Sequence, residues 1–478
     1  MPFLCLEETL TSTQIPAAVA DQIAALAKQS MDTDEIPGLS IGIVRGNELV
    51  AHYGFGTTSL GTDSPATPLT VSRVASITKT FTATAILQLR DLGQLELDDP
   101  LLVHMPDFTI ASALGGALEG VTLRRLMTHY SGLRTEHPLT DWDTPSFPHA
   151  ADVLDNLADI DVVIPQDSQW KYSNLAVALL GQVVEIVSNT PYEQYVDEEI
   201  IRPLGLTNTY FEPKSDDQNA LKATGYGHPE PGSEQLREAP YASLNGISAA
   251  GQLHSNVEDL AKWVGFQFTS GRTTHPSKVL AATTLAEMHR PYKLSDDWTL
   301  GQALAWRMVR RGENVFHNHG GGIQGFASNV VFNVPGQTGA IVLANIWPAP
   351  TPYILAEDIA ELVLNELGPV EESRESNLTD VASDIAEKYT GRYWAEPGAY
   401  VDVIYEQGGL KLGAPREGDY TLHGPAGLQI DPAVTSENSF RVVGNRGAGE
   451  LAEFSIGSDG GASEFRLGGF LYRKVGEE

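Results

Sequence analysis

The order of strand-like and helix-like patterns along the chain limits the folds that it can adopt. Two apolar segments, 39–44 and 48–53, are typical of strands, and Arg45-Gly46-Asn47 between them is a tight hairpin signal. A mostly helical region follows over 76–263. Four further strand patterns come after it, at 302–310, 314–319, 326–334 and 339–346. A helical insertion between two halves of an antiparallel sheet predicts an α/β fold with a cleft between its layers.

A second region of different character follows this α/β pattern. Amphipathic helices are expected at 14–31 and 354–367, on either side of the sheet segments. The stretch 369–383 is polar and charged, which is typical of a linker. Short strand patterns alternate with Gly-rich turns beyond it. We therefore expect one domain over 1–368, a linker over 369–383 and a small all-β barrel domain over 384–478.

Composition and charge exclude several classes of function. The net charge of −31 repels phosphate backbones and anionic lipid, so nucleic acid and membrane are poor partners; the plain alternative is a solvated acidic surface. The single cysteine, Cys5, excludes an internal disulfide and is typical of a reducing compartment. The N-terminal residues lack the basic region of a secretory signal, and no apolar run is long enough to span a bilayer. A cytoplasmic location is expected, and the alternative is a chain from which a leader has already been removed.

Ser76 and Lys79 stand three residues apart before the apolar run 81–89, which predicts a helix. Side chains at this spacing share one helix face, so the serine hydroxyl and the lysine amine could meet. A lysine shielded from water loses its proton more easily and can activate a serine for nucleophilic attack. The alternative is a serine that caps the helix and a lysine that points into solvent.

Two later segments offer further polar groups. Tyr172 and Asn174 precede an apolar helix, and His319 precedes the glycines 320–322. A phenol near cations has a lowered pKa and could relay a proton. The Asn174 carboxamide could hold Lys79 or bind a substrate amide, since it has both donors and an acceptor. The alternatives are a core tyrosine and a helix-capping asparagine, whereas the glycines allow close approach of backbone to a substrate.

The three motifs S-x-x-K, Y-x-N and H-x-G, in this order, resemble class C β-lactamases and D-alanyl-D-alanine carboxypeptidases, which are penicillin-binding-protein-like serine hydrolases. Other family-like segments are Ile36–Ser40, Leu97–Pro100, Leu126–Leu133, Pro203–Leu206, Ala250–Leu253 and Val342–Asn345. The resemblance implies a serine nucleophile with no cofactor and no metal. It implies catalytic roles for Ser76, Lys79 and Tyr172, and substrate or oxyanion contacts for Asn174, His319, Gly321 and Gly322.

One departure from the resembled pattern bears on the substrate. Penicillin-hydrolysing relatives usually carry lysine where this chain has His319, and a mostly neutral imidazole attracts a substrate carboxylate less. H-x-G is more similar to D-stereospecific aminopeptidases, amidases and esterases of the family. We expect hydrolysis of an ester or amide in a small molecule or short peptide, D-amino-acid peptides included. An acyltransferase of the same fold, a β-lactamase and a catalytically silent scaffold stay open as alternatives.

Three smaller interpretations complete the analysis. His317 and His319 form a single i, i+2 pair without a third clear ligand, so a metal site is not expected. His129 lies where the resembled family has a structural turn. The segment Tyr389–Tyr393 resembles the opening of the lipocalin-like C-terminal domain of some family peptidases. For that barrel a structural role, including formation of a homo-oligomer, is favoured over ligand binding.

Overall fold

The computed structural model describes residues 15–476 with gaps at 63, 115, 144–146, 231–232, 234, 271–278, 371–382, 396–398, 407–408, 414–425, 431–437 and 444–448. The chain divides into two compact units, Met1–Val370 and Glu371–Glu478, each described here by itself. Cys5 and the expected linker beyond Val370, up to residue 382, lie outside the described residues.

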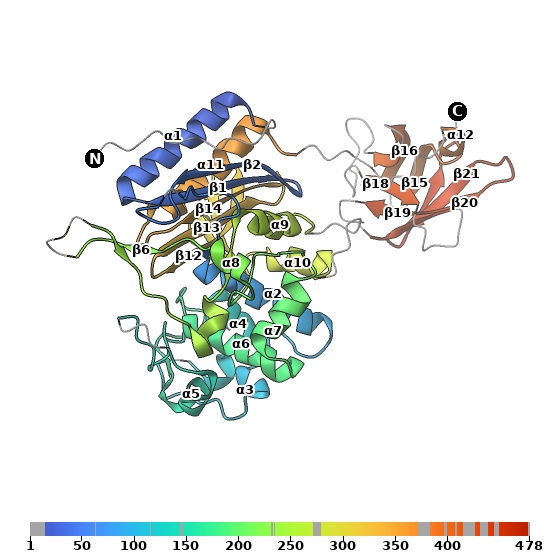
Figure 1. Ribbon diagram of the computed structural model, residues 1–478. Coiled ribbons are helices and arrows are strands. Elements are labelled where there is room, and N and C mark those ends of the chain that lie inside the picture. The colour runs from blue at the N-terminus through green and yellow to red at the C-terminus, as the bar shows by residue number, and fades with distance from the viewer. Residues whose placement is uncertain are drawn as a thin grey trace. The chain divides into compact units, whose positions relative to one another are not determined.

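The first unit is built on an antiparallel sheet in the order β2-β1-β14-β13-β12-β11-β10-β9 (Figure 1). The strands are β1 (Gly38–Arg45), β2 (Glu48–Gly56), β9 (Lys293–Leu294), β10 (Leu300–Gln302), β11 (Arg307–Arg311), β12 (Asn314–Ile323), β13 (Phe326–Asn333) and β14 (Thr338–Ala344). Pairing of β1 with β14, with Ile41 opposite Val342, joins the N-terminal hairpin to the later strands. The expected antiparallel sheet with a helical insertion is thus confirmed.

One expected strand is wrong. The segment 302–310 does not run as a single strand, because the backbone reverses between β10 and β11. Ala305 has a φ of 63° in this reversal, and Ala303 N–H donates to the carbonyl oxygen of Trp306. The apolar run that suggested a continuous strand is buried in this turn instead.

Helices cover both faces of the sheet. α1 (Ala17–Asp34) and α11 (Thr351–Leu367) lie together over one face, and α9 (Val257–Gln267) lies over the other (Figure 1). The remaining helices of this unit are α2 (Thr78–Asp91), α3 (Leu101–His104), α4 (Leu123–Thr128), α5 (Ala150–Asp155), α6 (Asn174–Ser188), α7 (Tyr192–Val196), α8 (Asp216–Ala220) and α10 (Ala282–Met288). Short strand pairs among them are β3 (Ser72–Arg73) with β8 (His254–Ser255), β4 (Ser112–Ala113) with β5 (Asp161–Val162), and β6 (Tyr226–Gly227) with β7 (Arg237–Glu238).

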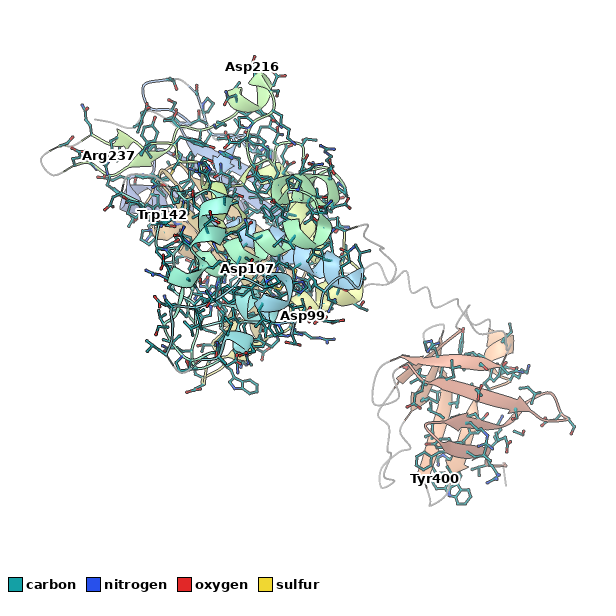
Figure 2. The ribbon with its side chains drawn as sticks, turned by 90° about the horizontal axis from the view of Figure 1, so that it is seen from below. Asp99, Asp107, Trp142, Asp216, Arg237 and Tyr400 are labelled. Carbon is teal, nitrogen blue, oxygen red and sulfur yellow. The ribbon has the colours of Figure 1, made fainter. Side chains whose placement is uncertain are left out.

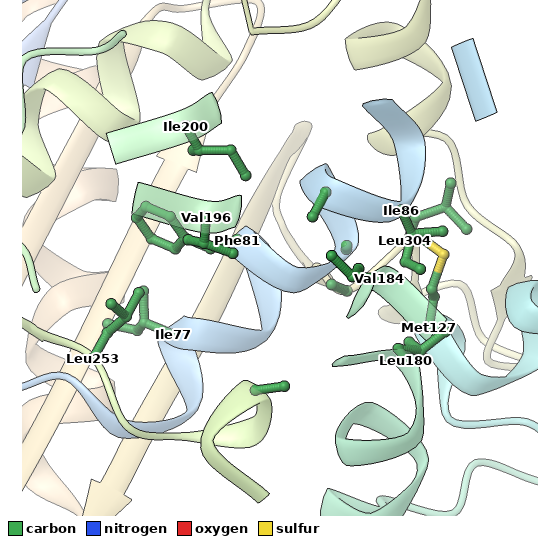
Figure 3. Packing of buried hydrophobic residues seen from close by; sticks show 14 of the residues in the cluster. Ile77, Phe81, Ile86, Met127, Leu180, Val184, Val196, Ile200, Leu253 and Leu304 are labelled. Atoms are coloured by element: carbon green, nitrogen blue, oxygen red, sulfur yellow. The ribbon is translucent and has the colours of Figure 1, made fainter. Parts of the chain in front are cut away.

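Helix α2 is buried along nearly its whole length, although it carries several polar residues. Its threonine hydroxyls have partners within the helix or outside it: Thr84 Oγ1 donates to the carbonyl oxygen of Thr80, and Thr82 Oγ1 donates to that of Ala249. Its apolar side chains pack on several neighbouring elements, with Phe81 beside Val196 and stacked on Trp263 at 3.9 Å between ring centroids (Figure 3). This packing positions the N-terminal half of α2 against its neighbours.

The second unit is an all-β barrel, as expected. Its strands are β15 (Gly391–Ala395), β16 (Ala399–Glu406), β17 (Gly409–Gly413), β18 (Ala426–Ile430), β19 (Ser439–Val443), β20 (Leu451–Ile456), β21 (Ala462–Leu467) and β22 (Phe470–Lys474), preceded by α12 (Ser383–Ala386). Pairing of β22 with β15 closes the ring. Aromatic side chains fill its interior, and Phe465 stacks on Tyr472 at 4.7 Å between centroids. A relationship to lipocalin-like domains stays a prediction.

Acidic side chains are spread over the outside of the first unit. Asp107 and Asp216 are both exposed, and Figure 2 shows Asp216 at the edge of this unit, on α8. Across the part of the chain that the structure describes, no helix combines the length and the apolar character needed to cross a membrane.

Candidate active site

A tight turn presents Ser76. The chain leaves β3 at Arg73 and forms a single 3-10 turn, Ala75–Ile77, before α2 begins at Thr78. Ala75 has a φ of 46°, an uncommon conformation for a residue with a side chain, and such strain often marks functional sites. Thr78 Oγ1 stabilises the turn by donating to the carbonyl oxygen of Ala75 at 2.6 Å. Ser76 does not cap α2, because Ile77 occupies the cap position and makes no side-chain cap bond.

Lys79 is almost completely buried, with 1% of its surface exposed, so the alternative of a solvated lysine does not hold. Its Nζ donates to Ser76 Oγ at 2.9 Å and to the carbonyl oxygen of Ala250 at 2.6 Å. Burial lowers the pKa of Lys79 to about 7, because desolvation penalises the ammonium form. A large fraction of this amine is therefore neutral near pH 7 and able to accept a proton.

Tyr172 lies on the other side of the serine hydroxyl. Its phenol donates to Ser76 Oγ at 2.8 Å. The expectation that nearby cations lower its pKa is wrong: burial raises the pKa of Tyr172, and this desolvation outweighs the lowering effects of the hydrogen bond with Ser76 and of the Arg307 charge. Tyr172 is therefore a neutral phenol at physiological pH, suited to donate or relay a proton rather than to act as a phenolate base.

His129 holds the Tyr172 segment in position. It ends α4 with a φ of 62°, and its ring lies 4.5 Å from the Tyr172 ring, centre to centre. Ser173 N–H donates to His129 Nδ1 at 3.2 Å, and Lys171 N–H donates to the His129 carbonyl oxygen at 2.8 Å. Burial holds the pKa of His129 well below its usual value, so the ring is neutral and Nδ1 can accept this bond. The structural interpretation of His129 agrees with these contacts.

Asn174 is the first residue of α6, and Ser173 is the cap, since Ser173 Oγ accepts from the N–H of Ala176. The Asn174 side chain faces the pocket around Ser76, and its Nδ2 donates to Glu136 Oε1 at 2.5 Å. Its hydrogen-bond partner is therefore Glu136 rather than Lys79. Glu136 was not found from the sequence, because it lies 38 residues earlier in a segment without a motif.

The three glycines after His319 let β12 pack directly against its neighbours. A Cβ on Gly321 would lie 2.1 Å from the carbonyl oxygen of Val74, and one on Gly322 would lie 2.5 Å from Trp347 Nε1. Real side chains do not fit at such distances, so only glycine permits this approach. Gly322 and Ser76 both line the pocket, and their service as an oxyanion hole stays a prediction.

The two histidines of β12 have different surroundings. His319 lines the pocket, and burial together with the nearby Lys79 amine lowers its pKa to about 3, so the imidazole is neutral. His317 is buried two residues earlier on the strand, donates from Nε2 to the carbonyl oxygen of His289 at 2.9 Å, and stacks on Phe332. Over the described ranges, no group of three or more His, Cys, Asp or Glu side chains is arranged to hold a metal ion.

The pocket that contains Ser76 has a volume of about 390 Å³, within the usual range for small-molecule sites. Aromatic side chains contribute to its walls, among them Trp142, Trp170, Trp347 and Tyr353. Arg307 adds an exposed cation, with its guanidinium carbon 5.4 Å from the centre of the Trp170 ring. No sequence pattern singled out these walls, because they come from separate loops and strands that meet only in the fold.

The family is decided by sequence comparison. The beta-lactamase family profile matches residues 23–364. This chain belongs to the β-lactamase family. Proteins with this fold are generally serine hydrolases. The expected resemblance to class C β-lactamases and penicillin-binding-protein-like carboxypeptidases is confirmed at the level of family and fold.

Individual relatives are 26% to 29% identical to this β-lactamase-family chain over the aligned residues. Beta-lactamase-like protein 2 of Dictyostelium discoideum is 29% identical over 355 residues, covering 72% of this chain and 62% of the relative. Protein flp of Staphylococcus aureus (strain MRSA252) is 26% identical over 325 residues, covering 68% of this chain and 62% of the relative. The chain thus spans less than two thirds of the length of these curated relatives.

Solved structures agree on the fold. The octameric penicillin-binding protein homologue from Pyrococcus abyssi aligns over 95% of this chain and 100% of its own, with a TM-score of 0.61 and 24% identity. The beta-lactamase/D-alanine carboxypeptidase from Pseudomonas syringae aligns over 74% of this chain and 100% of its own, with a TM-score of 0.61 and 22% identity. At these identities the likeness is one of fold.

Proposed function

We propose that this chain is a serine hydrolase that cleaves an ester or amide bond of a small molecule or short peptide, D-amino-acid peptides included, through an acyl-enzyme on Ser76. The observation that carries the proposal is the contact of Ser76 Oγ with both Lys79 Nζ and the Tyr172 phenol, at 2.9 and 2.8 Å. A nucleophile between a base and a proton donor, in a pocket of small-molecule size, has the parts that acyl transfer needs.

In the proposed first step, the neutral Lys79 amine accepts the proton of Ser76 as Oγ attacks the substrate carbonyl carbon. The developing oxyanion is held by the backbone N–H groups of Ser76 and Gly322; loss of one such donor typically costs ~3–4 kcal/mol of transition-state stabilisation. The leaving group takes a proton through Tyr172, whose phenol stays neutral because of its burial. The ester or amide bond breaks, and the acyl group stays on Ser76.

In the second step, water attacks the acyl-enzyme and gives up its proton to the same Lys79–Tyr172 pair. The carboxylic acid is released and Ser76 is restored. Asn174 and His319 line the same pocket and are proposed to contact the substrate, since the carboxamide oxygen can accept a hydrogen bond and the imidazole is neutral. The absence of a lysine at His319 favours esters and amides over penicillins.

A reactive fluorophosphonate tests the nucleophile. Mass spectrometry of the treated protein should find one adduct on the peptide that contains Ser76, and Ser76→Ala should abolish it. Ser168→Ala, which removes an exposed serine hydroxyl that only contacts the Pro165 carbonyl, serves as the matched control and should label normally. Labelling of the Ser76→Ala protein at full extent would exclude the assignment. A panel of acyl esters and D- and L-amino acid anilides then defines the substrate.

A further inference from the structure

A second cavity lies apart from the pocket that holds Ser76. It has a volume of about 170 Å³, and none of its lining residues lines the first pocket. Basic and polar side chains in its wall are Arg73, Lys222, Thr224, Tyr241, His254 and Gln324. Pairing of Arg73 with His254 across β3 and β8, and the bridge of Val71 to Lys222, place these groups on adjoining backbone segments. The proposed hydrolase chemistry uses none of them.

Arg73 is the unusual member of this wall, because its charge is buried with little compensation. It is 3% exposed, and only Nη2 has a hydrogen-bond acceptor, Gln252 Oε1 at 3.3 Å. Nε and Nη1 have no hydrogen-bond partner among the described residues. Burial lowers the pKa of Arg73 to about 10, which still leaves it charged at neutral pH. Burying a cation whose N–H groups lack acceptors costs free energy, so the position of Arg73 suggests that an anion outside the described contacts compensates the charge.

The side chains near Arg73 compensate its charge only in part. Glu212 is the nearby carboxylate, but it is exposed, and its Oε1 accepts from the Tyr241 phenol and from Gln252 Nε2 at 2.8 Å. The Tyr241 ring faces the guanidinium, with 4.9 Å between the Arg73 Cζ and the ring centre. A cation–π contact of this kind stabilises the charge but satisfies no N–H group in the guanidinium plane.

Lys222 adds a second cation to the same cavity. Its Nζ lies 5.3 Å from the centre of the Tyr241 ring, so the ring is flanked by both Arg73 and Lys222. Two positive side chains around one small cavity attract an anion, and a guanidinium suits carboxylate or phosphate oxygens. The two cations lie in a chain whose net charge is −31.

We propose that this second cavity binds a small oxyanion, a carboxylate or phosphate group, between the Arg73 guanidinium and the Lys222 ammonium. The volume admits a single acid group with a short substituent and is below the range of about 300–1,000 Å³ for drug-sized ligands. Arg73 lies three residues before Ser76, and Val74 N–H donates to the Leu253 carbonyl oxygen at 2.9 Å. A bound oxyanion would therefore stabilise the pairing of β3 with β8, next to the turn Ala75–Ile77 that presents Ser76.

Titration of the full chain with inorganic phosphate and, separately, with acetate tests the site at constant ionic strength set by chloride. Either anion should raise the thermal unfolding midpoint with its concentration, as expected for a ligand that binds only the folded state. Binding of phosphate alone identifies a phosphate group as the ligand class, and binding of acetate as well identifies a carboxylate. No shift with either anion relative to chloride overturns the proposal.

Variants assign the site. Lys222→Gln should weaken the binding affinity for the anion by about tenfold, which is the effect of losing one charged hydrogen bond of ~1.5 kcal/mol. Lys214→Gln is the matched control, since Lys214 is an exposed lysine paired with Asp197, and it should bind like the unaltered chain. Arg307→Gln reports on binding in the first pocket. If Arg307→Gln loses anion binding while Lys222→Gln keeps it, the anion binds in the Ser76 pocket rather than in the second cavity, and the assignment is overturned.

Discussion

Asn174 Nδ2 donates a hydrogen bond of 2.5 Å to Glu136 Oε1, so one carboxamide joins a half-buried carboxylate to the pocket that contains Ser76. The negative charge of Glu136 acts on Lys79 and raises the lysine pKa, against the larger effect of burial. Glu136 therefore limits the fall in the pKa of Lys79, the proposed base, that burial causes.

Glu136→Gln should shift the acid limb of the pH–rate profile to lower pH. The amide keeps an acceptor for Asn174 but removes the charge that stabilises the Lys79 ammonium, so the pKa falls below about 7 and the neutral amine forms at lower pH. kcat/KM measured against pH on an activated ester reads this pKa in the free enzyme. Glu230→Gln, at an exposed glutamate paired with Arg237, is the control and should leave the limb in place. An unmoved limb in Glu136→Gln would show that another group controls it.

The Lys79 and Tyr172 side chains should act as a unit. Lys79→Ala and Tyr172→Phe should each lower kcat by ~10²–10⁴-fold, and the double variant should lose little more, because the proposed relay of a proton from Ser76 to the leaving group needs both side chains. Steady-state kinetics of the double-mutant cycle measures this coupling. Losses that multiply in full would mean that the two residues serve independent steps.

The sequence predicted the parts of the site that depend on local spacing. The three-residue spacing in S-x-x-K and the glycine run after His319 are local patterns with a direct geometric meaning, and the structure brings both segments to one pocket. The pKa of Tyr172 was predicted in the wrong direction, because its burial arises from elements distant in the chain. Glu136 and the Ala250 carbonyl were missed for the same reason: neither contact has a sequence signal.

The fold could be predicted where patterns are long and periodic. The hairpin 39–53 and the strands from 314 onward correspond to β1, β2, β12, β13 and β14, since alternation and buried apolar runs identify strands well. The segment 302–310 failed because a tight reversal with a left-handed Ala305 interrupts an apolar run. Alanine carries no local signal for such a turn, whereas glycine or asparagine would have given one.

Selectivity should depend on His319. Burial keeps this imidazole neutral, so it provides no cation for a penicillin carboxylate, and short acyl esters or amides should be turned over far better than penicillins. His319→Lys should raise penicillin hydrolysis relative to ester hydrolysis. Comparison of kcat/KM for both substrate types in both proteins checks this. A penicillin kcat/KM in the unaltered protein at or above ~10⁴ M⁻¹s⁻¹ would refute it.

Gly321→Ala should destabilise the first unit. The added Cβ would meet the Val74 carbonyl oxygen at 2.1 Å, and backbone cannot move aside as a flexible side chain can. Overpacking of this kind typically costs ~1–3 kcal/mol in the free energy of unfolding. Gly227→Ala is the matched control, because its nearest neighbour lies at 3.4 Å, an ordinary contact. Denaturant unfolding compares the two, and equal stability of both variants would show that β12 can move away from the serine turn.

Removal of the barrel should leave the nucleophile reactive. All residues that line the Ser76 pocket precede Val370, and so do both core clusters that pack the first sheet and α2. Residues up to Val370 thus contain their own core, whereas the barrel has a separate aromatic interior. A chain that ends at Val370 should therefore be folded, as judged by circular dichroism, and should react with the fluorophosphonate at Ser76. Its substrate preference or oligomeric state is free to change. A folded truncated protein that no longer labels at Ser76 would mean that the barrel contributes directly to the active site.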